Sequence, residues 1–208
     1  IGEFDVHLRT LRDRQQFYDR NGAAEKMGIS PASWSLFGVI WDSSMVLAHL
    51  VLEMDIQEVR ILELGCGIGL PSHILNLRKA NITATDVHPC AEEFMDQNTL
   101  LNDCRKIPFV RTSWLDVDDA LGRFDVIIGS DLLYERDNVE QLSYFIERHS
   151  KPNNKVVIVD PGRFLHARFS REMKKQGYGF QKRRPEVGRY LDKPFRGVVL
   201  TYERLNTL

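Results

Sequence analysis

Three glycines spaced two residues apart carry the first chemistry that the sequence suggests. Gly65, Gly67 and Gly69 follow directly on the apolar run Ile-Leu-Glu-Leu at 61–64. Glycines permit positive φ and let a ligand approach the backbone closely. Their G-x-G-x-G spacing differs from the G-x-G-x-x-G that is typical of dinucleotide pyrophosphate sites. The loop therefore favours a ligand with a cationic amino-acid head over an anionic pyrophosphate.

Two acidic residues flank this loop. Glu63 stands two residues before the first glycine, where it can meet an ammonium group or a bridging water. Asp86 lies seventeen positions after Gly69, at the end of the next apolar run, where it can accept hydrogen bonds from ribose hydroxyls. Together these features predict S-adenosylmethionine as the ligand. The structural alternative is a tight strand-to-helix turn followed by an incidental aspartate.

The elements that must position these residues follow an alternating pattern. From Val59 onward, short apolar runs are separated by longer amphipathic segments, as in a parallel sheet with crossover helices. We expect an α/β fold: a doubly wound, Rossmann-like sheet of seven strands, mostly parallel, with a C-terminal antiparallel hairpin. Such sheets bind ligands at the carboxyl ends of their strands. The expected strands are 59–64, 82–86, 108–112, 124–130, 156–160, 178–183 and 196–203, and the expected helices are 70–79, 90–102, 139–150 and 165–176.

The residues before the first strand are expected to form a helical preface. One helical repeat is carried by Leu8, Leu11 and Phe17, and a second runs from Asp42 to Leu52. We expect residues 1–57 to pack as an N-terminal helical segment on a core formed by 58–208. With 208 residues, the two parts make one compact domain.

Composition excludes several classes of protein. No apolar run approaches the roughly 18 residues of a membrane-spanning helix, and the N-terminus does not resemble a secretory signal. We expect a cytoplasmic protein with no membrane span and with Cys66, Cys90 and Cys104 as reduced thiols. His73 and His88 lack partners at ligand spacing, so no metal site is expected. With 28 basic and 29 acidic residues, the near-neutral charge gives no support for bulk adhesion to nucleic acid or membrane.

Four further motifs resemble those of a known family. Residues 41–47, W-D-S-S-M-V-L, are similar to a W-[DE]-[AS]-x-x-x-L segment, and 114–116, W-L-D, to a tryptophan beside the adenine. Residues 131–134, D-L-L-Y, resemble a D-x-x-[YF] motif. Residues 160–163, D-P-G-R, are similar to the electron-transfer-flavoprotein β-subunit lysine methyltransferases. The chain thus resembles the seven-strand S-adenosylmethionine methyltransferases, and within them the family 16 protein lysine methyltransferases.

The resemblance implies a set of roles. Asp131 is expected to bind and orient an acceptor ammonium, and Tyr134 to offer its hydroxyl or ring face to the developing cation. A helix N-cap and a packed core aromatic are the alternatives for these two residues. Trp41 and Trp114 are either cofactor contacts or core side chains, and the resemblance favours the former. The expected cofactor-binding residues are Trp41, Glu63, Gly65, Cys66, Gly67, Gly69, Asp86, Trp114 and Ser130.

The identity of the methyl acceptor stays open at the sequence level. The resemblance implies a lysine of a protein, whereas amine methyltransferases of small molecules share the same W and D-x-x-Y motifs. A cofactor-binding scaffold without turnover is a third possibility. Between Arg163 and Arg189 lie nine basic residues and two acidic ones, a face that could receive a protein partner or RNA. A solvated helix surface is the simpler reading of these charges.

Overall fold

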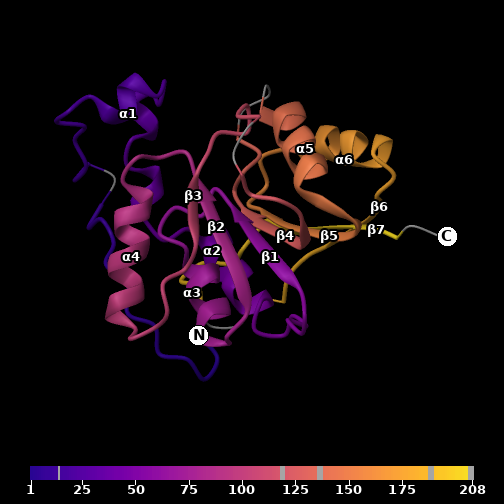
Figure 1. The fold of residues 1–208 in the computed structure, drawn as a ribbon, viewed down its shortest axis with the longest axis horizontal. Coiled ribbons are helices and arrows are strands. Elements are labelled where there is room, and N and C mark those ends of the chain that lie inside the picture. Colours follow the sequence, from indigo (N-terminus) through magenta and orange to yellow (C-terminus); the bar gives the residue numbers. More distant parts are fainter. Residues whose placement is uncertain (14, 118–119, 135–137, 187–189, 206–208) are drawn as a thin grey trace.

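A seven-stranded sheet forms the centre of the protein, with strand order β3-β2-β1-β4-β5-β7-β6 (Figure 1). The computed structural model describes residues 1–13, 15–117, 120–134, 138–186 and 190–205. The expected α/β fold is confirmed. The strands are β1 Arg60–Leu64, β2 Asn81–Asp86, β3 Phe109–Arg111, β4 Phe124–Ser130, β5 Ser150–Asp160, β6 Gly179–Arg183 and β7 Val198–Arg204. The helices are α1 Ala23–Lys26, α2 Asp42–Leu50, α3 Leu70–Leu77, α4 Ala91–Leu101, α5 Asn138–His149 and α6 His166–Lys175, with 3-10 turns at Pro31–Ser33 and Leu36–Gly38.

The strand directions match the expected mixture. Strands β1 to β5 are parallel to one another. Strand β7 lies between β5 and β6 and is antiparallel to both. Because strand order reverses between β1 and β4, the crevice at their carboxyl ends is where a ligand is expected in a sheet of this kind.

Helices cover both faces of the sheet. Side chains alternate between the two faces of a strand, so Ile61 packs in a core cluster with α2 and α3 while Leu62 packs in a second cluster with α5 and α6. In Figure 1, α5 and α6 lie together over β4 and β5, and α4 lies beside β3 at the other end of the sheet. The glycine loop follows the carboxyl end of β1, between the helices on the two faces of the sheet.

The N-terminal segment differs from the expectation. The helix expected around Leu8, Leu11 and Phe17 is wrong: residues 4–11 are extended, and 15–17 form a turn and an irregular stretch. The side chain of Asn98 on α4 accepts a hydrogen bond from Arg9 N (2.6 Å) and donates one to Arg9 O (3.2 Å). Leu8, Leu11 and Phe17 pack in one cluster with residues of α4 and of the loop before α2, so their apolar character reflects these tertiary contacts and not a helical repeat. The second expected helix is present as α2.

The β5 strand begins six residues earlier than the expected 156, at Ser150. Residues 151–154, Lys-Pro-Asn-Asn, are polar and contain a proline, so they lack the apolar pattern of a buried strand. The side chain of Asn154 donates to Phe124 O at 2.9 Å, which ties this first part of β5 to β4. Polar side chains therefore extend the pairing of β5 with β4 into a stretch that lacks the apolar pattern of a buried strand.

Candidate functional site

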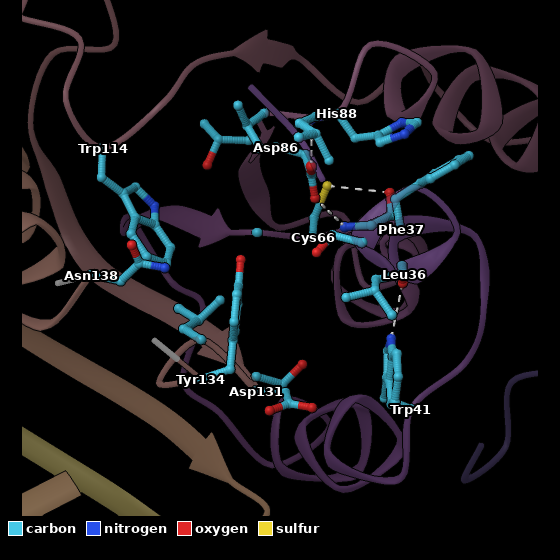
Figure 2. Close-up of a pocket in the computed structure, with 18 of the residues that line it drawn as sticks. Leu36, Phe37, Trp41, Cys66, Asp86, His88, Trp114, Asp131, Tyr134 and Asn138 are labelled. Atoms are coloured by element: carbon cyan, nitrogen blue, oxygen red, sulfur yellow. Dashed lines mark hydrogen bonds between the residues drawn. The ribbon is translucent and has the colours of Figure 1, made fainter. Parts of the chain in front are cut away.

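A cavity of about 540 Å³ lies at the carboxyl ends of β1, β2 and β4. Its size falls within the range of pockets for cofactors and small ligands. Figure 2 shows side chains from separate elements around a central space, with Trp114 and Asn138 on one side and Phe37 and Trp41 across from them. Nine of the eleven expected site residues line the cavity: Trp41, Gly65, Cys66, Gly67, Asp86, Trp114, Ser130, Asp131 and Tyr134.

The glycine loop passes directly under this cavity. Gly67 has φ of 55°, and a Cβ at this position would lie 2.6 Å from the carbonyl oxygen of Phe37. Only glycine combines this backbone conformation with such close packing. Gly69 does not line the cavity; it precedes α3 with φ of 68° and packs against Met95. The first two glycines thus shape the ligand side, and the third shapes the helix contact.

Asp86 anchors the loop from the end of β2. Its Oδ2 accepts a hydrogen bond from Gly67 N and its Oδ1 accepts one from His88 N, both at 2.8 Å. Burial raises the pKa of Asp86, and the backbone hydrogen bonds oppose that shift. Each carboxylate oxygen keeps a second lone pair. Asp86 can therefore hold the loop and still accept a hydroxyl from a ligand in the cavity.

Glu63 is placed differently from the expectation. It is almost fully buried and does not line the cavity; its Oε2 accepts hydrogen bonds from Ser72 N, at 3.0 Å, and from Ser72 Oγ. Burial raises the pKa of Glu63 to about 8, with the Ser72 hydrogen bonds opposing the shift. At neutral pH this carboxyl is mostly uncharged. In this structure Glu63 fixes the start of α3 and is not positioned to meet an ammonium group.

Cys66 lies between the two loop glycines. Burial, together with the nearby Asp86 and Glu63 carboxylates, raises the pKa of its thiol well above the usual range. A thiol in that state is a poor nucleophile. Cys66 acts here as a small apolar wall of the cavity.

Aromatic rings form two opposite walls of the cavity. The Phe37 and His88 rings stack with centroids 3.9 Å apart, and burial lowers the pKa of His88 to about 4. Trp41 donates from Nε1 to Leu36 O at 3.0 Å. Trp114 lies in a turn that Asp116 closes by accepting from Ser113 N at 2.7 Å. These flat, uncharged surfaces suit a heterocyclic base.

Asp131 forms an ion pair that the sequence did not indicate. It has φ of 56°, and its backbone N donates to Val159 O at 2.9 Å. Arg163 Nε lies 2.6 Å from Asp131 Oδ1, and Arg163 Nη2 lies 2.8 Å from Oδ2. This bidentate pairing neutralises the carboxylate at the edge of the cavity. The hydrogen bond to Asp131 raises the pKa of Arg163, so the guanidinium stays charged.

The position of Arg163 depends on the turn after β5. Asp160 is fully buried, and its Oδ1 accepts from Gly162 N at 2.7 Å and from Arg163 N at 3.0 Å. Asp160 does not itself line the cavity, whereas Arg163 does. The D-P-G-R sequence thus builds a turn that directs an arginine toward Asp131.

Several cavity residues carried no signal that sequence reasoning could use. Leu36, Phe37 and Val39 come from the loop before α2, which has no repeat to mark it. Asn138 and Gln141 come from the first two turns of α5. They follow the D-x-x-Y motif in the sequence, but no motif spacing connects them to it. Tyr134 lies at the mouth with 46% of its surface exposed, and Figure 2 shows its ring directed into the central space.

The residues present fit S-adenosylmethionine. Asp86 at the end of β2 suits ribose hydroxyls, the backbone at Gly65 and Gly67 leaves room for a close approach, and Trp114 offers a flat face for adenine. The Asp131 and Arg163 side chains reach the same cavity from β4 and β5. Among the described residues, no group of three or more His, Cys, Asp or Glu side chains could hold a metal ion.

Solved structures similar to this chain include two methyltransferases. The ribosomal protein L11 methylase of Lactobacillus delbrueckii subsp. bulgaricus superposes with a TM-score of 0.64 at 19% identity, over 80% of each chain. Magnesium protoporphyrin IX methyltransferase of Synechocystis PCC 6803, solved with bound SAM, superposes with a TM-score of 0.60 at 16% identity, over 78% of each chain. The fold is that of the S-adenosylmethionine-dependent methyltransferases.

A family model described as lysine methyltransferase matches residues 30–175. The chain belongs to this family.

Similar curated proteins include three protein methyltransferases. Electron transfer flavoprotein beta subunit lysine methyltransferase of Rattus norvegicus is 26% identical over 163 residues, covering 76% of this chain and 61% of the relative. Protein N-lysine methyltransferase METTL21A of Danio rerio is 31% identical over 141 residues, covering 60% of this chain and 62% of the relative. Histidine protein methyltransferase 1 homolog of Dictyostelium discoideum is 29% identical over 123 residues, covering 56% of this chain and 40% of the relative. The chain thus spans about three fifths of the length of the first two relatives.

Proposed function

We propose that the protein transfers a methyl group from S-adenosylmethionine to the side-chain nitrogen of a lysine in a protein. The observation that carries this proposal is the placement of Asp131 and Tyr134 on the same cavity as Gly67 and Asp86. The residues expected to bind the cofactor and those expected to contact the methyl acceptor thus line the same cavity at the carboxyl ends of the strands. Membership of the lysine methyltransferase family and similarity to named protein N-lysine methyltransferases support the acceptor class.

The chain's own residues account for most of what methyl transfer requires. When bound, S-adenosylmethionine supplies an electrophilic methyl group that an uncharged amine can attack directly. The protein must therefore hold the amine in line, keep water out, and favour the deprotonated amine. The rings of Phe37 and Trp41 on one side and of Trp114 on the other provide apolar walls for the first two tasks.

The role of the Asp131–Arg163 pair follows from the need to deprotonate the acceptor lysine. A free lysine has a pKa near 10.4, and an isolated carboxylate beside it would raise that pKa further. Because Arg163 neutralises Asp131, the carboxylate can orient the amine through its remaining lone pairs with little stabilisation of the ammonium form. Tyr134 lies beside the pair at the mouth, where its ring can face a cation that forms on the nitrogen.

Exposure at the mouth supports a macromolecular acceptor over a small amine. Tyr134 is 46% exposed, and Arg163 is also partly open to solvent. A lysine side chain can enter such an opening while the rest of its protein stays outside. A small-molecule amine methyltransferase and a scaffold without turnover are the competing functions.

The test is incubation with methyl-labelled S-adenosylmethionine and an extract of the source cells, followed by separation into protein, RNA and small molecules. We expect label in protein, recovered as methyl-lysine after acid hydrolysis, and no label with Asp131→Asn. Label as methyl-histidine would move the acceptor to the class named for the Dictyostelium relative. Label only in small molecules or RNA would overturn the protein-lysine proposal, and cofactor binding without any transfer would favour a scaffold.

A cytoplasmic location forms part of the proposal. It is supported by the three cysteines, which are all free thiols in the structure. Among the described residues, no helix is both long and apolar enough to cross a membrane. Fractionation of source cells with an antibody to the protein tests the location.

A further inference from the structure

Exposed arginines gather at one edge of the sheet, next to the cavity. Arg183 ends β6, Arg184 follows it, and Arg196 stands two residues before β7; all three are exposed. We refer to these three residues as the basic rim. The described parts of the segment 182–196 carry five basic residues and two acidic ones, Glu186 and Asp192. The rim is therefore locally positive although the whole chain is near neutral.

Strand register relates the basic rim to the cavity. Ser130, which lines the cavity, pairs with Val159; Val159 pairs with Val199, and Val199 pairs with Arg183. These four residues form one row across β4, β5, β7 and β6. With strands about 4.8 Å apart, Arg183 lies about 14 Å from Ser130 at the same end of the sheet.

Arg196 lies nearer to the cavity than Arg183. Its neighbour Gly197 packs so closely on β5 that a Cβ there would lie 2.2 Å from Asp160 O. Asp160 in turn begins the turn that presents Arg163 to the cavity. The backbone next to Arg196 thus packs against the residue whose side chain holds the turn that positions Arg163.

An exposed aromatic residue lies on the same route. Phe164 directly follows Arg163, is 89% exposed, and has φ of 62°. Positive φ in a bulky residue is strained, and such strain is most often found at functional sites. The next element, α6, packs over β7 through the Phe169 and Tyr202 rings. Phe164 therefore presents an exposed ring directly after Arg163, which lines the cavity.

Three other basic residues of the region form ion pairs with acidic side chains. Arg163 pairs with Asp131, Arg168 pairs with Glu140, and Lys175 pairs with Glu172. No ion pair involves Arg183, Arg184 or Arg196 within the described part of the chain. The three arginines of the basic rim are thus exposed positive charges without an acidic partner among the described residues, while Arg171 and Lys174 on α6 carry comparable exposed charges farther along the chain.

We propose that the basic rim docks an acidic segment of the protein substrate and so selects which lysine reaches the cavity. This inference rests on the proposed protein-lysine function. An extended chain advances about 3.3 Å per residue, so it covers about 14 Å in about four residues. The acceptor lysine therefore has acidic residues about four to six positions away along its own chain, with Phe164 contacting the residues between them.

Two synthetic peptides test this selection. Each has one central lysine; the first carries glutamates at positions four to six on both sides, and the second carries glutamines there. With methyl-labelled S-adenosylmethionine, we expect kcat/KM for the glutamate peptide to exceed that for the glutamine peptide by about tenfold at low salt. The preference should shrink as ionic strength rises, because exposed charges are screened.

Variants of the protein connect this preference to the rim. Arg183→Gln with Arg196→Gln should reduce the glutamate preference to about twofold or less and leave kcat/KM for the glutamine peptide unchanged. The matched control is Arg171→Gln with Lys174→Gln, which removes two exposed charges from α6 and should keep the preference. Phe164→Ala should lower kcat/KM for both peptides, because its contact does not depend on charge.

The outcomes separate the two proposals. Equal methylation of both peptides by the wild-type protein overturns the docking proposal and leaves the protein-lysine function standing. Equal loss of preference in the rim variant and the α6 control also overturns it. If neither peptide is methylated and the cell extract yields label only in RNA or small molecules, the proposed function itself fails. Label in RNA that the rim variant abolishes would assign the basic rim to RNA.

Discussion

The charge state of the acceptor end depends on two residues from different strands. Asp131 follows β4 and Arg163 follows β5, and their bidentate contact makes the edge of the cavity nearly neutral. A lone carboxylate would bind an ammonium tightly and hold it in the unreactive protonated form. In the proposed reaction, the pair separates the orientation of the amine from stabilisation of its charge.

Removal of the arginine should expose this division of roles. In Arg163→Gln, the uncompensated Asp131 carboxylate raises the pKa of a bound lysine, so the rise of kcat with pH should move about one unit to higher pH. Asp131→Asn should lower kcat by about 100-fold or more and change the cofactor dissociation constant by less than about threefold. Initial rates between pH 6.5 and 10, with cofactor affinity from calorimetry, check both.

The double variant provides the control. Asp131→Asn with Arg163→Gln removes both charges, so the pH profile should return toward that of the wild type while the rate stays low. A profile in Arg163→Gln that coincides with the wild type would contradict the role given to the arginine. Loss of cofactor affinity in Asp131→Asn would assign that aspartate to the cofactor.

Glu63 makes the stability of the protein depend on pH. Its folded pKa of about 8 lies above the ordinary value of 4.5, so the folded state holds a proton that the unfolded state releases in between. Stability from this group is present in full below about pH 4.5 and is lost as pH rises through 8. In Glu63→Gln, the free energy of unfolding should fall less between pH 5 and pH 8, by roughly 3 kcal/mol.

Urea unfolding at pH 5, 6, 7 and 8 measures the difference. Glutamine keeps an oxygen that can accept the hydrogen bonds from Ser72. The comparison therefore isolates the titration from the packing. Parallel stability curves for the two proteins across this range would rule out the assigned pKa.

At the scale of the elements, the N-terminal segment acts as a strap across α4. Asn98 hydrogen-bonds both backbone groups of Arg9, and Asn102 hydrogen-bonds both backbone groups of His7. Further along, Leu11 N donates to Gly38 O at 2.7 Å, next to the cavity residue Phe37. The strap therefore connects α4 with one wall of the cavity.

Asn98→Ala should release this strap. The change leaves two backbone groups of Arg9 without their buried partner, which should lower the free energy of unfolding by about 1 to 3 kcal/mol. Trypsin should cleave after Arg9 and Arg12 faster than in the wild type. Cofactor affinity should fall several-fold, because Phe37 loses support. Limited proteolysis with mass spectrometry and calorimetry measure these effects.

Gln97→Ala is the matched control on the same helix. Gln97 donates to Glu93 Oε1 at 2.9 Å, and within the described part of the chain its side chain makes no hydrogen bond to the backbone of the strap. Its substitution should leave both proteolysis and cofactor affinity unchanged. Equal cleavage rates in the two variants would show that the strap is not held by Asn98.

At the scale of the whole molecule, cofactor binding should stabilise the entire fold, because its site joins β1, β2, β4 and the loop before α2. At S-adenosylmethionine concentrations 100 times the dissociation constant, binding adds about 2.7 kcal/mol. For a chain of this length, that corresponds to a rise in Tm of about 5 to 10 °C. Asp86→Asn should abolish most of this rise, whereas Asp96→Asn, which alters an exposed ion pair with Lys106, should keep it. Thermal scanning with and without the ligand decides between these outcomes.

The sequence predicted much of the fold because its central strands are buried on both faces. Their apolar runs ended within a few residues of the observed limits, and β4 was placed at its observed bounds, Phe124–Ser130. The glycine loop and the Asp131–Tyr134 motif were predictable for a related reason, since both directly follow such strands. In both places, the local residue pattern and the position after a buried strand indicate the same site.

Contacts between distant segments could not be predicted from apolar runs or local motifs. The ion pair of Asp131 with Arg163 joins residues 32 positions apart, and no local spacing reports it. Glu63 was expected to face the ligand, but side chains alternate along β1 and its carboxylate reaches Ser72 on α3. The strap was mistaken for a helix because its partners lie on α4, about 90 residues away.

The position of β7 also constrains the order in which the chain can fold during synthesis. A ribosome releases β6 before β7, yet β6 pairs with no strand other than β7 in the described sheet. Until β7 has emerged and entered between β5 and β6, the edge of β5 stays open and the charged strand β6 has no neighbour. Translation past residue 204 is therefore needed before this side of the sheet can close, and nascent chains arrested earlier would expose β5 to chaperones.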